Sequence, residues 1–441
     1  MAAINEVSIS RRIAVVLSIL AASGMAYYYL AILLPNTLAT PAHPTIGRHP
    51  FGSDFYQVWF TSRECLPQRL DPYSLTVAHK IQAGVFGHEL SSSNPDRRPE
   101  EYRAFAYPAF ADVIGLPVAW LQYSTARIVL VITLVLLTSA SVLLWAKGLG
   151  WSPGFSVLIV FVGLTLSSYQ GLEALYALQP GLIVAFLLSA AIAALAANKL
   201  RLAGFLLAFS TIKPQVSALL ILYLLLWSMG NWQERRKLAL AFLTTLAVLC
   251  AAATLVWPTW ILGWQKAIAK YPGYYSGPPL LDMFGTYFGS LLLVVILAVT
   301  IAFAWNNRHE EPTSFRFALT VSFLLAITTI TIVPEHAVYD HVILLPGIMM
   351  GARSWQVIWQ RNLVARGIFA LAVGALLWQW MAAPVVLLVH AIAPHTQSAL
   401  LFFPLRTAAA IPFVAVSVLC LMIWQRKAKQ HLVAVANRFK S

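Results

Sequence analysis

The chain has 441 residues, of which 59% are hydrophobic and only 10% are charged. Soluble domains carry roughly 25% charged residues, so this composition excludes a soluble protein and predicts an all-α polytopic membrane protein. The net charge of +14 does not indicate a nucleic-acid partner, because the basic residues gather in short loops between apolar stretches. The three cysteines, Cys65, Cys250 and Cys420, are widely separated and match no disulfide or metal-binding spacing.

Apolar stretches recur along the whole chain and predict about 10–12 transmembrane helices, since a spanning helix needs roughly 20 apolar residues. Residues 1–34 lack a small-residue cleavage site, so we expect the first stretch to be retained as a helix. No repeat or linker divides the chain, which we expect to form a single integral membrane domain over residues 1–441. The expected spans lie near 12–34, 124–147, 154–172, 180–197, 201–212, 214–230, 237–257, 283–305, 314–333, 338–352, 366–389 and 400–424.

The basic residues also predict the orientation of these spans. With the N-terminus in the cytoplasm, the cytoplasmic loops carry most of the lysines and arginines, and the short outward loops carry few. Both termini, including a basic tail at 425–441, are therefore expected to be cytoplasmic. Polar residues then collect on the outward side, as a membrane enzyme or transporter with an outward-facing site requires. They are Asp54, Tyr107, Gln170, Glu173, Gln179, Lys213, Glu335, His336, Asp340 and His341.

The first outward segment, residues 35–123, is too long for an ordinary connection and is expected to carry function or juxtamembrane helices. Apolar residues at helical spacing predict an amphipathic helix that starts at Ser53 as N-cap, with Asp54 in its first turn. Asp54 is either a helix cap or a general base, because a base needs a carboxylate partly shielded by apolar neighbours. We expect a second helix around Leu75–Phe86 and a partly inserted element around Phe110–Leu121.

Lys213 stands where two apolar stretches meet at Pro214. A cation at a helix break inside a membrane bundle is expensive and is typically functional, and it suits a phosphate leaving group. The alternative is a lysine that extends to the outer membrane surface.

The segment from Pro334 to His341 holds two histidines and two acids. His336 and Asp340 are four residues apart and would share one helix face. The segment lacks a metal-protease signature and a third ligand, so we do not expect a metal. Phosphate or sugar binding and a plain polar helix end remain the two interpretations.

Two further groups have two interpretations each. Gln179, with Gln170 and Glu173, would either hydrogen-bond sugar hydroxyls or form an ordinary loop. The loop at 258–282 and its flanks hold aromatic residues that form either an interfacial belt or a sugar-stacking lid. These aromatic residues are Trp257, Trp260, Trp264, Tyr271, Tyr274 and Tyr275.

An ordered set of short motifs resembles the polyprenyl-phosphate-mannose-dependent mannosyltransferases, glycosyltransferase family 87 of the GT-C superfamily. The resemblance covers about residues 54–346, although Ala109 stands where such a loop often has a second proline. The acidic pair of protein O-mannosyltransferases is missing. The motifs are Ser53-Asp54-Phe55 with Trp59, Asp71-Pro72-Tyr73, Phe105-Ala106-Tyr107-Pro108, Gln179-Pro180-Gly181, Lys213-Pro214-Gln215 and Tyr339-Asp340-His341.

The resemblance implies a GT-C fold, a lipid-linked sugar donor, an inverting transfer at the outer membrane face and Asp54 as the base. It places Lys213 and the segment from His336 to His341, including Asp340, near the donor phosphate. Gln179 and Tyr107 are also expected to bind the phosphate or the sugar of the donor.

From this resemblance we expect a bacterial inner-membrane enzyme that moves a sugar, mannose above others, from polyprenyl phosphate to a lipid or glycan acceptor. No cofactor is expected. Two alternatives stay open: a secondary transporter with Lys213, Asp340 and Glu173 in an ion path, and a non-catalytic membrane scaffold.

Overall fold

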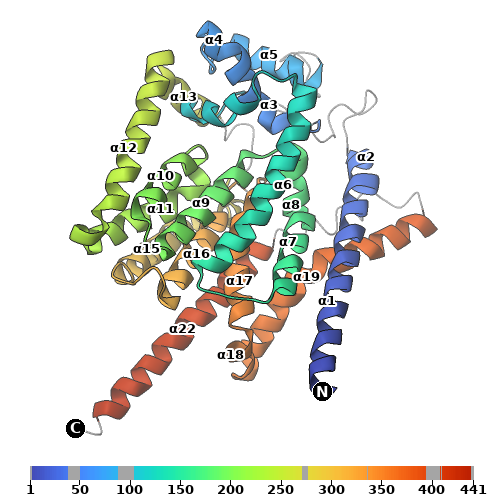
Figure 1. Ribbon diagram of the computed structural model, residues 1–441, viewed down its shortest axis with the longest axis vertical. Helices are drawn as coiled ribbons and strands as arrows, with labels where there is room; N and C mark the ends of the chain where they lie inside the picture. Colours follow the sequence, from blue (N-terminus) through green and yellow to red (C-terminus); the bar gives the residue numbers. More distant parts are fainter. Residues whose placement is uncertain are drawn as a thin grey trace.

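The computed structural model describes residues 2–37, 50–87, 104–270, 277–334, 336–393, 408 and 410–438. Within those ranges every regular element is a helix (Figure 1), which confirms the all-α polytopic membrane architecture. The short helices between Ser53 and Val118, together with α13 (Trp260–Lys270), form a cap at one end of the bundle (Figure 1). The N-terminus of α1 (Ala2–Tyr27) lies at the opposite end (Figure 1).

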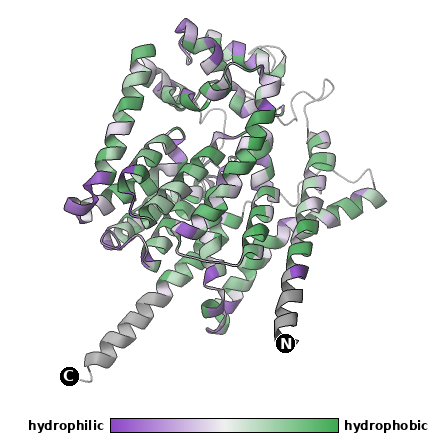
Figure 2. Cartoon of the chain, in the orientation of Figure 1, coloured by the Kyte–Doolittle hydropathy of each residue, from purple (hydrophilic) through white to green (hydrophobic). Residues whose placement is uncertain are grey.

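Five helices are long and apolar enough to cross a membrane by length and composition. A sixth candidate is the pair α7 (Phe155–Ser167) and α8 (Tyr169–Ala177), which bends by 59° at Ser168. Figure 2 shows apolar residues along most of the length of these helices. The five are α1 from Arg12 with its continuation to Leu33, α6 (Tyr123–Gly148), α12 (Trp232–Val256), α15 (Thr286–Asn306) and α19 (Leu363–Ile392).

The remaining apolar helices have 10–17 residues each. At 1.5 Å per residue they are shorter than the roughly 30 Å hydrocarbon layer, so the count of about 10–12 spans stays a prediction for them. They are α9 (Pro180–Ala196), α10 (Leu200–Ser210), α11 (Pro214–Gly230), α16 (Phe315–Thr331) and the first half of α22 (Ile411–Arg438).

The expected span at 338–352 is wrong as a continuous helix. It consists of a 3-10 helix, η7 (Val338–Leu344), followed by the nine-residue α17 (Leu345–Arg353). Pro346 lies in the first turn of α17, where its missing N–H costs nothing but prevents the helix from continuing backwards.

Two described parts of the predicted first loop, residues 50–87 and 104–123, contain the short helices that were predicted there. α5 (Leu75–Phe86) has the predicted bounds, and the partly inserted element consists of two 3-10 helices, η4 (Ala109–Ile114) and η5 (Leu116–Val118). The other elements of the cap and of the connections are η1 (Tyr28–Leu33), α2 (Leu34–Thr37), α3 (Ser53–Phe60), η2 (Thr61–Cys65), α4 (Leu66–Gln68), α14 (Pro279–Phe284) and α18 (Trp355–Trp359).

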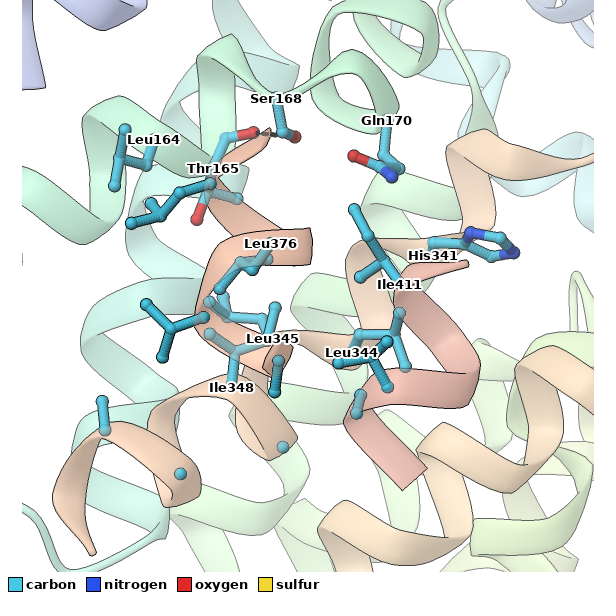
Figure 3. A pocket seen from close by; sticks show the side chains of 18 of the residues that line it. Leu164, Thr165, Ser168, Gln170, His341, Leu344, Leu345, Ile348, Leu376 and Ile411 are labelled. Atoms are coloured by element: carbon cyan, nitrogen blue, oxygen red, sulfur yellow. Dashed lines mark hydrogen bonds between the residues drawn. The ribbon is translucent and has the colours of Figure 1, made fainter. Parts of the chain in front are cut away.

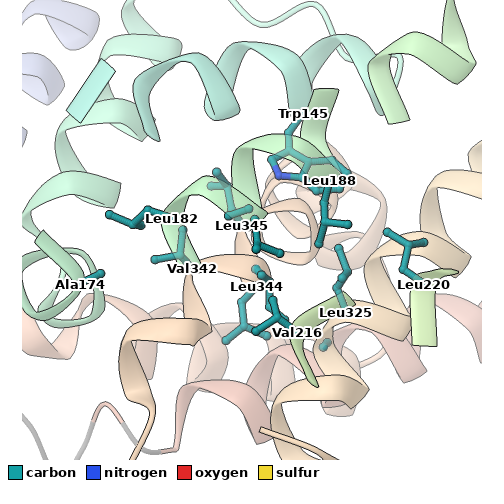
Figure 4. Packing of buried hydrophobic residues seen from close by; sticks show 14 of the residues in the cluster. Trp145, Ala174, Leu182, Leu188, Val216, Leu220, Leu325, Val342, Leu344 and Leu345 are labelled. Carbon is teal, nitrogen blue, oxygen red and sulfur yellow. The ribbon is translucent and has the colours of Figure 1, made fainter. Parts of the chain in front are cut away.

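The core lies where the short helices meet α6. Trp145, Leu188, Leu220 and Leu325 come from α6, α9, α11 and α16 and are almost fully buried together (Figure 4). Leu345 of α17 joins the same cluster (Figure 4). This packing buries the starts of α9 and α11 inside the bundle, and those starts carry the polar residues of the candidate site.

Candidate active site

Asp54 lies in the first turn of α3 and is only 6% exposed. The predicted cap is wrong: Ser53 is the first helical residue, and the N-cap is Gly52, whose φ of 81° is a left-handed conformation that glycine adopts readily. Gly52 therefore occupies the cap position directly before the helix. Asp54 lies in the first turn, where the helix dipole favours a negative charge.

Three hydrogen bonds with two neighbouring helices hold the start of α3 in place. The N–H of Gly52 donates to the carbonyl of Tyr176 at 2.9 Å, and the hydroxyl of Tyr123 donates to the carbonyl of Gly52. The Arg127 guanidinium donates to the carbonyl of Phe51 at 3.3 Å. The first loop is thus fixed to α8 and α6 directly before Asp54.

A continuous chain of polar contacts runs inward from Asp54. The Gln179 amide N–H donates to Asp54 Oδ2, and the Gln179 carbonyl oxygen accepts from Lys213 Nζ at 3.1 Å. Lys213 Nζ also lies 2.7 Å from Asp340 Oδ1, and these two side chains are 5% and 0% exposed. We call these four residues the polar relay. It joins three predicted site residues to Asp54, although they come from distant parts of the sequence.

The ends of helices supply the members of the relay. Gln179 is the N-cap of α9 and Lys213 the N-cap of α11, and in both cases the next residue is a proline at the first helical position. A Cβ on Gly181 would lie 2.4 Å from Asp340 Oδ1, so the relay needs a glycine there. The two x-Pro steps therefore place polar side chains at helix starts that meet inside the bundle.

An apolar pocket of about 290 Å³ lies next to the relay, between α7, α17, α19 and α22 (Figure 3). Gln170 and His341 line the same side of it, whereas leucines such as Leu344 and Leu376 line the rest (Figure 3). Both ring nitrogens of His341, Nε2 of Gln170 and Oδ2 of Asp340 are buried and find no hydrogen-bond partner in the part of the chain that the structure describes. Buried polar atoms are rarely left unpaired, so the side of the pocket lined by Gln170 and His341 is a candidate position for a polar group of a ligand.

Two predicted site residues, His336 and Tyr107, lie outside the regular helices. His336 precedes η7, which begins at Val338 as a 3-10 helix, so the expectation that His336 and Asp340 share a helix face is wrong. Tyr107 lies in the cap, where its carbonyl accepts from the Tyr73 hydroxyl at 2.8 Å.

The three residues of the transporter alternative form two polar contacts with different partners. Glu173 accepts a hydrogen bond from the Tyr29 hydroxyl at 2.8 Å, whereas Lys213 pairs with Asp340. Glu335 lies outside the described residues.

The predicted aromatic loop packs partly against the cap. The Trp257 indole donates to the carbonyl of Leu70 at 2.8 Å, and the Trp264 indole donates to that of Ala106 at 3.1 Å. Trp260 is 4% exposed, whereas Tyr271, Tyr274 and Tyr275 lie outside the described residues.

Among the described residues, no group of three His, Cys, Asp or Glu side chains is arranged to hold a metal ion. The sequence analysis missed one buried acid, Asp112 in η4, which accepts a hydrogen bond from the Ser62 hydroxyl. Burial raises the pKa of the Asp112 carboxyl from 3.8 to about 7, although the Ser62 hydroxyl acts in the opposite direction. The sequence feature that could have indicated Asp112 is its position as an acid inside the apolar stretch at 109–118.

The family model for glycosyltransferase family 87 matches residues 105–334, more than half of the chain. This range contains Gln179 and Lys213 but neither Asp54 nor Asp340. No curated protein matches the sequence, and no solved structure matches it either.

Proposed function

Because the chain belongs to glycosyltransferase family 87 and is a membrane glycosyltransferase, we propose that it transfers mannose from polyprenyl phosphate to an acceptor hydroxyl, with Asp54 as the base. The observation that carries this proposal is the polar relay. It connects a buried carboxylate of the first loop to a buried lysine, beside a pocket apolar enough for a lipid chain.

In the proposed step, Asp54 takes the proton of the acceptor hydroxyl while the oxygen attacks the anomeric carbon of the donor. The bond between that carbon and the phosphate oxygen breaks, and polyprenyl phosphate leaves with the bonding electrons. Attack from the face opposite the leaving group inverts the anomeric configuration. Donor and acceptor are bound on opposite sides of the reacting carbon.

The burial of Asp54 supports its role as base. Its side chain lies in a buried helix start, and the Gln179 N–H supplies a directed hydrogen bond. That bond orients the carboxylate. A general base must first lie in the right geometry to reach the proton, and only then does its proton affinity affect the rate.

The pocket beside His341 supports a lipid donor. Its walls are mostly leucine, isoleucine, valine and phenylalanine, which suit an isoprenoid chain, and the unpaired polar atoms of Gln170 and His341 suit a phosphate or sugar oxygen. We therefore place the first isoprene units in this pocket and the phosphate near His341 and Lys213.

Lys213 is already paired with Asp340, so it does not meet the phosphate as a free cation. In the proposed transition state Lys213 moves part of its interaction from the Asp340 carboxylate to the leaving phosphate oxygen, where negative charge develops. Basic side chains compensate that charge, and we expect no metal requirement. We place the reaction at the outer membrane face of a bacterial inner membrane, where a lipid or glycan acceptor meets the cap.

The test uses purified protein in lipid nanodiscs with radiolabelled polyprenyl-phosphate mannose and a membrane lipid extract as acceptor. Asp54→Asn keeps an oxygen that accepts from Gln179 but cannot take a proton, so we expect transfer to fall by about 10²–10⁴-fold. Asp112→Asn is the matched control, because it removes another buried acid of the same cap outside the relay. We expect it to retain transfer.

Three results would contradict parts of the proposal. Equal transfer by wild type and Asp54→Asn rejects the base assignment. Transfer only from a polyprenyl-phosphate glucose or galactose rejects mannose but keeps the lipid donor. Transfer only from a soluble nucleotide sugar, offered in a parallel reaction, rejects the lipid donor.

A further inference from the structure

A second, larger hollow lies at the opposite ends of α9 and α11 from the polar relay. Its volume is about 920 Å³, and its lining comes from the turn between α9 and α10, the first turns of α12 and the segment after α15. α9 has 17 residues, which corresponds to about 26 Å, so the two sites are separated by the length of this helix. The hollow therefore plays no part in the relay.

The charge of this hollow is positive, because basic side chains outnumber acidic ones in its lining. Lys199, Arg201 and Lys237 line it, all three are exposed, and none of them forms an ion pair among the described residues. Of the two acids of the lining, Glu311 pairs with Arg235 at 3.2 Å. Glu234 accepts from the neutral Asn231 amide at 2.6 Å and keeps its charge, so four basic and two acidic side chains give the lining a net charge of +2.

The wall of the hollow is built rigidly. The Arg235 side chain is 5% exposed, and its guanidinium lies 4.0 Å above the Trp227 ring. It also donates to the carbonyls of Trp227 and Arg308, at 3.2 and 2.9 Å. These contacts fix the end of α11 against α12 and the segment after α15, so this wall of the hollow has a defined shape.

Apolar residues on α10 and α12 continue outward from the hollow. Leu202, which also lines it, is 45% exposed, and Phe205 and Leu240 are 46% and 51% exposed. Figure 2 shows the hydrophilic start of α12, at the left of the view, followed by apolar turns. A ligand that fits this surface has an anionic head and an apolar tail.

We infer that this hollow is a binding site for a phosphate-bearing anion, supplied by the headgroup of an anionic phospholipid. The phosphate lies among Lys199, Arg201 and Lys237, and the acyl chains follow the exposed apolar face of α10. A preference for basic residues on the cytoplasmic side accounts for their presence but not for their convergence on one hollow. The inference does not depend on the proposed sugar donor.

The experiment measures retention of lipids by native mass spectrometry of the full chain, purified in a neutral detergent and mixed with phosphatidylglycerol or phosphatidylcholine. We expect phosphatidylglycerol to bind at least tenfold more tightly. The triple variant Lys199→Gln, Arg201→Gln and Lys237→Gln should lose this preference, since each cation contributes to the attraction of an anionic headgroup.

The matched control removes three other basic residues that do not line the hollow: Lys147→Gln, Arg236→Gln and Arg366→Gln. It should keep the preference, and melting temperatures without lipid verify that both triple variants are folded. Equal loss in the two triple variants, or equal binding of the two lipids, overturns the inference. Displacement of the lipid by millimolar inorganic phosphate, but not by chloride at equal ionic strength, assigns the site to a soluble phosphate and overturns the lipid assignment.

Discussion

The ion pair between Lys213 and Asp340 makes a quantitative prediction about folding. Nζ and Oδ1 are 2.7 Å apart, and the two side chains are 5% and 0% exposed. Lys213→Met keeps the length and apolar stem of the side chain but leaves the Asp340 carboxylate buried without its cation. Breaking a buried pair in this way costs about 3–5 kcal/mol, because water cannot reach the remaining charge. Gln179 also loses its donor, which adds about 1 kcal/mol.

The double variant Lys213→Met with Asp340→Leu separates the charge from the packing. Replacing both partners of a buried pair by apolar groups is commonly close to neutral. We therefore expect the double variant to be more stable than Lys213→Met alone by about 2–4 kcal/mol. The free energy of unfolding is measured by denaturant titration in mixed micelles for wild type, both single variants and the double variant.

The coupling energy of this cycle decides the outcome. If the destabilisation of the double variant equals the sum for the two single variants, the pair contributes no coupling and the reasoning fails. It also fails if Lys213→Met is as stable as wild type. Transfer activity should be lost in all three variants, since each of them removes a member of the relay.

Two further changes test the surroundings of the relay and of the cap. Gly181→Ala should displace the Asp340 carboxylate and lower transfer at least tenfold with the charges intact, whereas Gly374→Ala, which meets no neighbouring atom, should not. For Asp112, the folded pKa of about 7 lies above the ordinary 3.8, so its contribution to stability is full below pH 4 and is lost as pH rises to 7. This amounts to about 4 kcal/mol, and Asp112→Asn should remove that part of the pH dependence of the melting temperature. Identical pH profiles for wild type and Asp112→Asn would contradict the assignment.

Local patterns predicted the individual elements well. The amphipathic helix over Leu75–Phe86 has the predicted bounds, Asp54 lies in a first helical turn, and Lys213 lies at a break between two helices. Each of these features depends on a few neighbouring residues, such as the proline after Lys213, so the sequence contains the information. The prediction of Ser53 as N-cap was wrong because the helix begins at Ser53 itself, and Gly52 takes the N-cap position in a left-handed conformation.

The contacts between the site residues could not be predicted from local sequence patterns. Gln179 bonds to Asp54 across 125 positions, and Lys213 bonds to Asp340 across 127. No local periodicity encodes pairings of that range. The spacing of His336 and Asp340 misled for another reason: it assumed 3.6 residues per turn, whereas the helix that begins at Val338 is a 3-10 helix.

The chemistry of residue 179 explains how the relay places two acids near one lysine. The position requires a donor toward Asp54 and an acceptor toward Lys213, and an amide supplies both without adding a charge. A carboxylate there would repel Asp54, and an ammonium would repel Lys213. With both acids ionised the relay has a formal charge of −1, so an incoming phosphate is repelled unless Lys213 is shared with it. In the proposed reaction, donor binding and the orientation of Asp54 would therefore be coupled, because the lysine that turns toward the phosphate also holds the Gln179 amide in place.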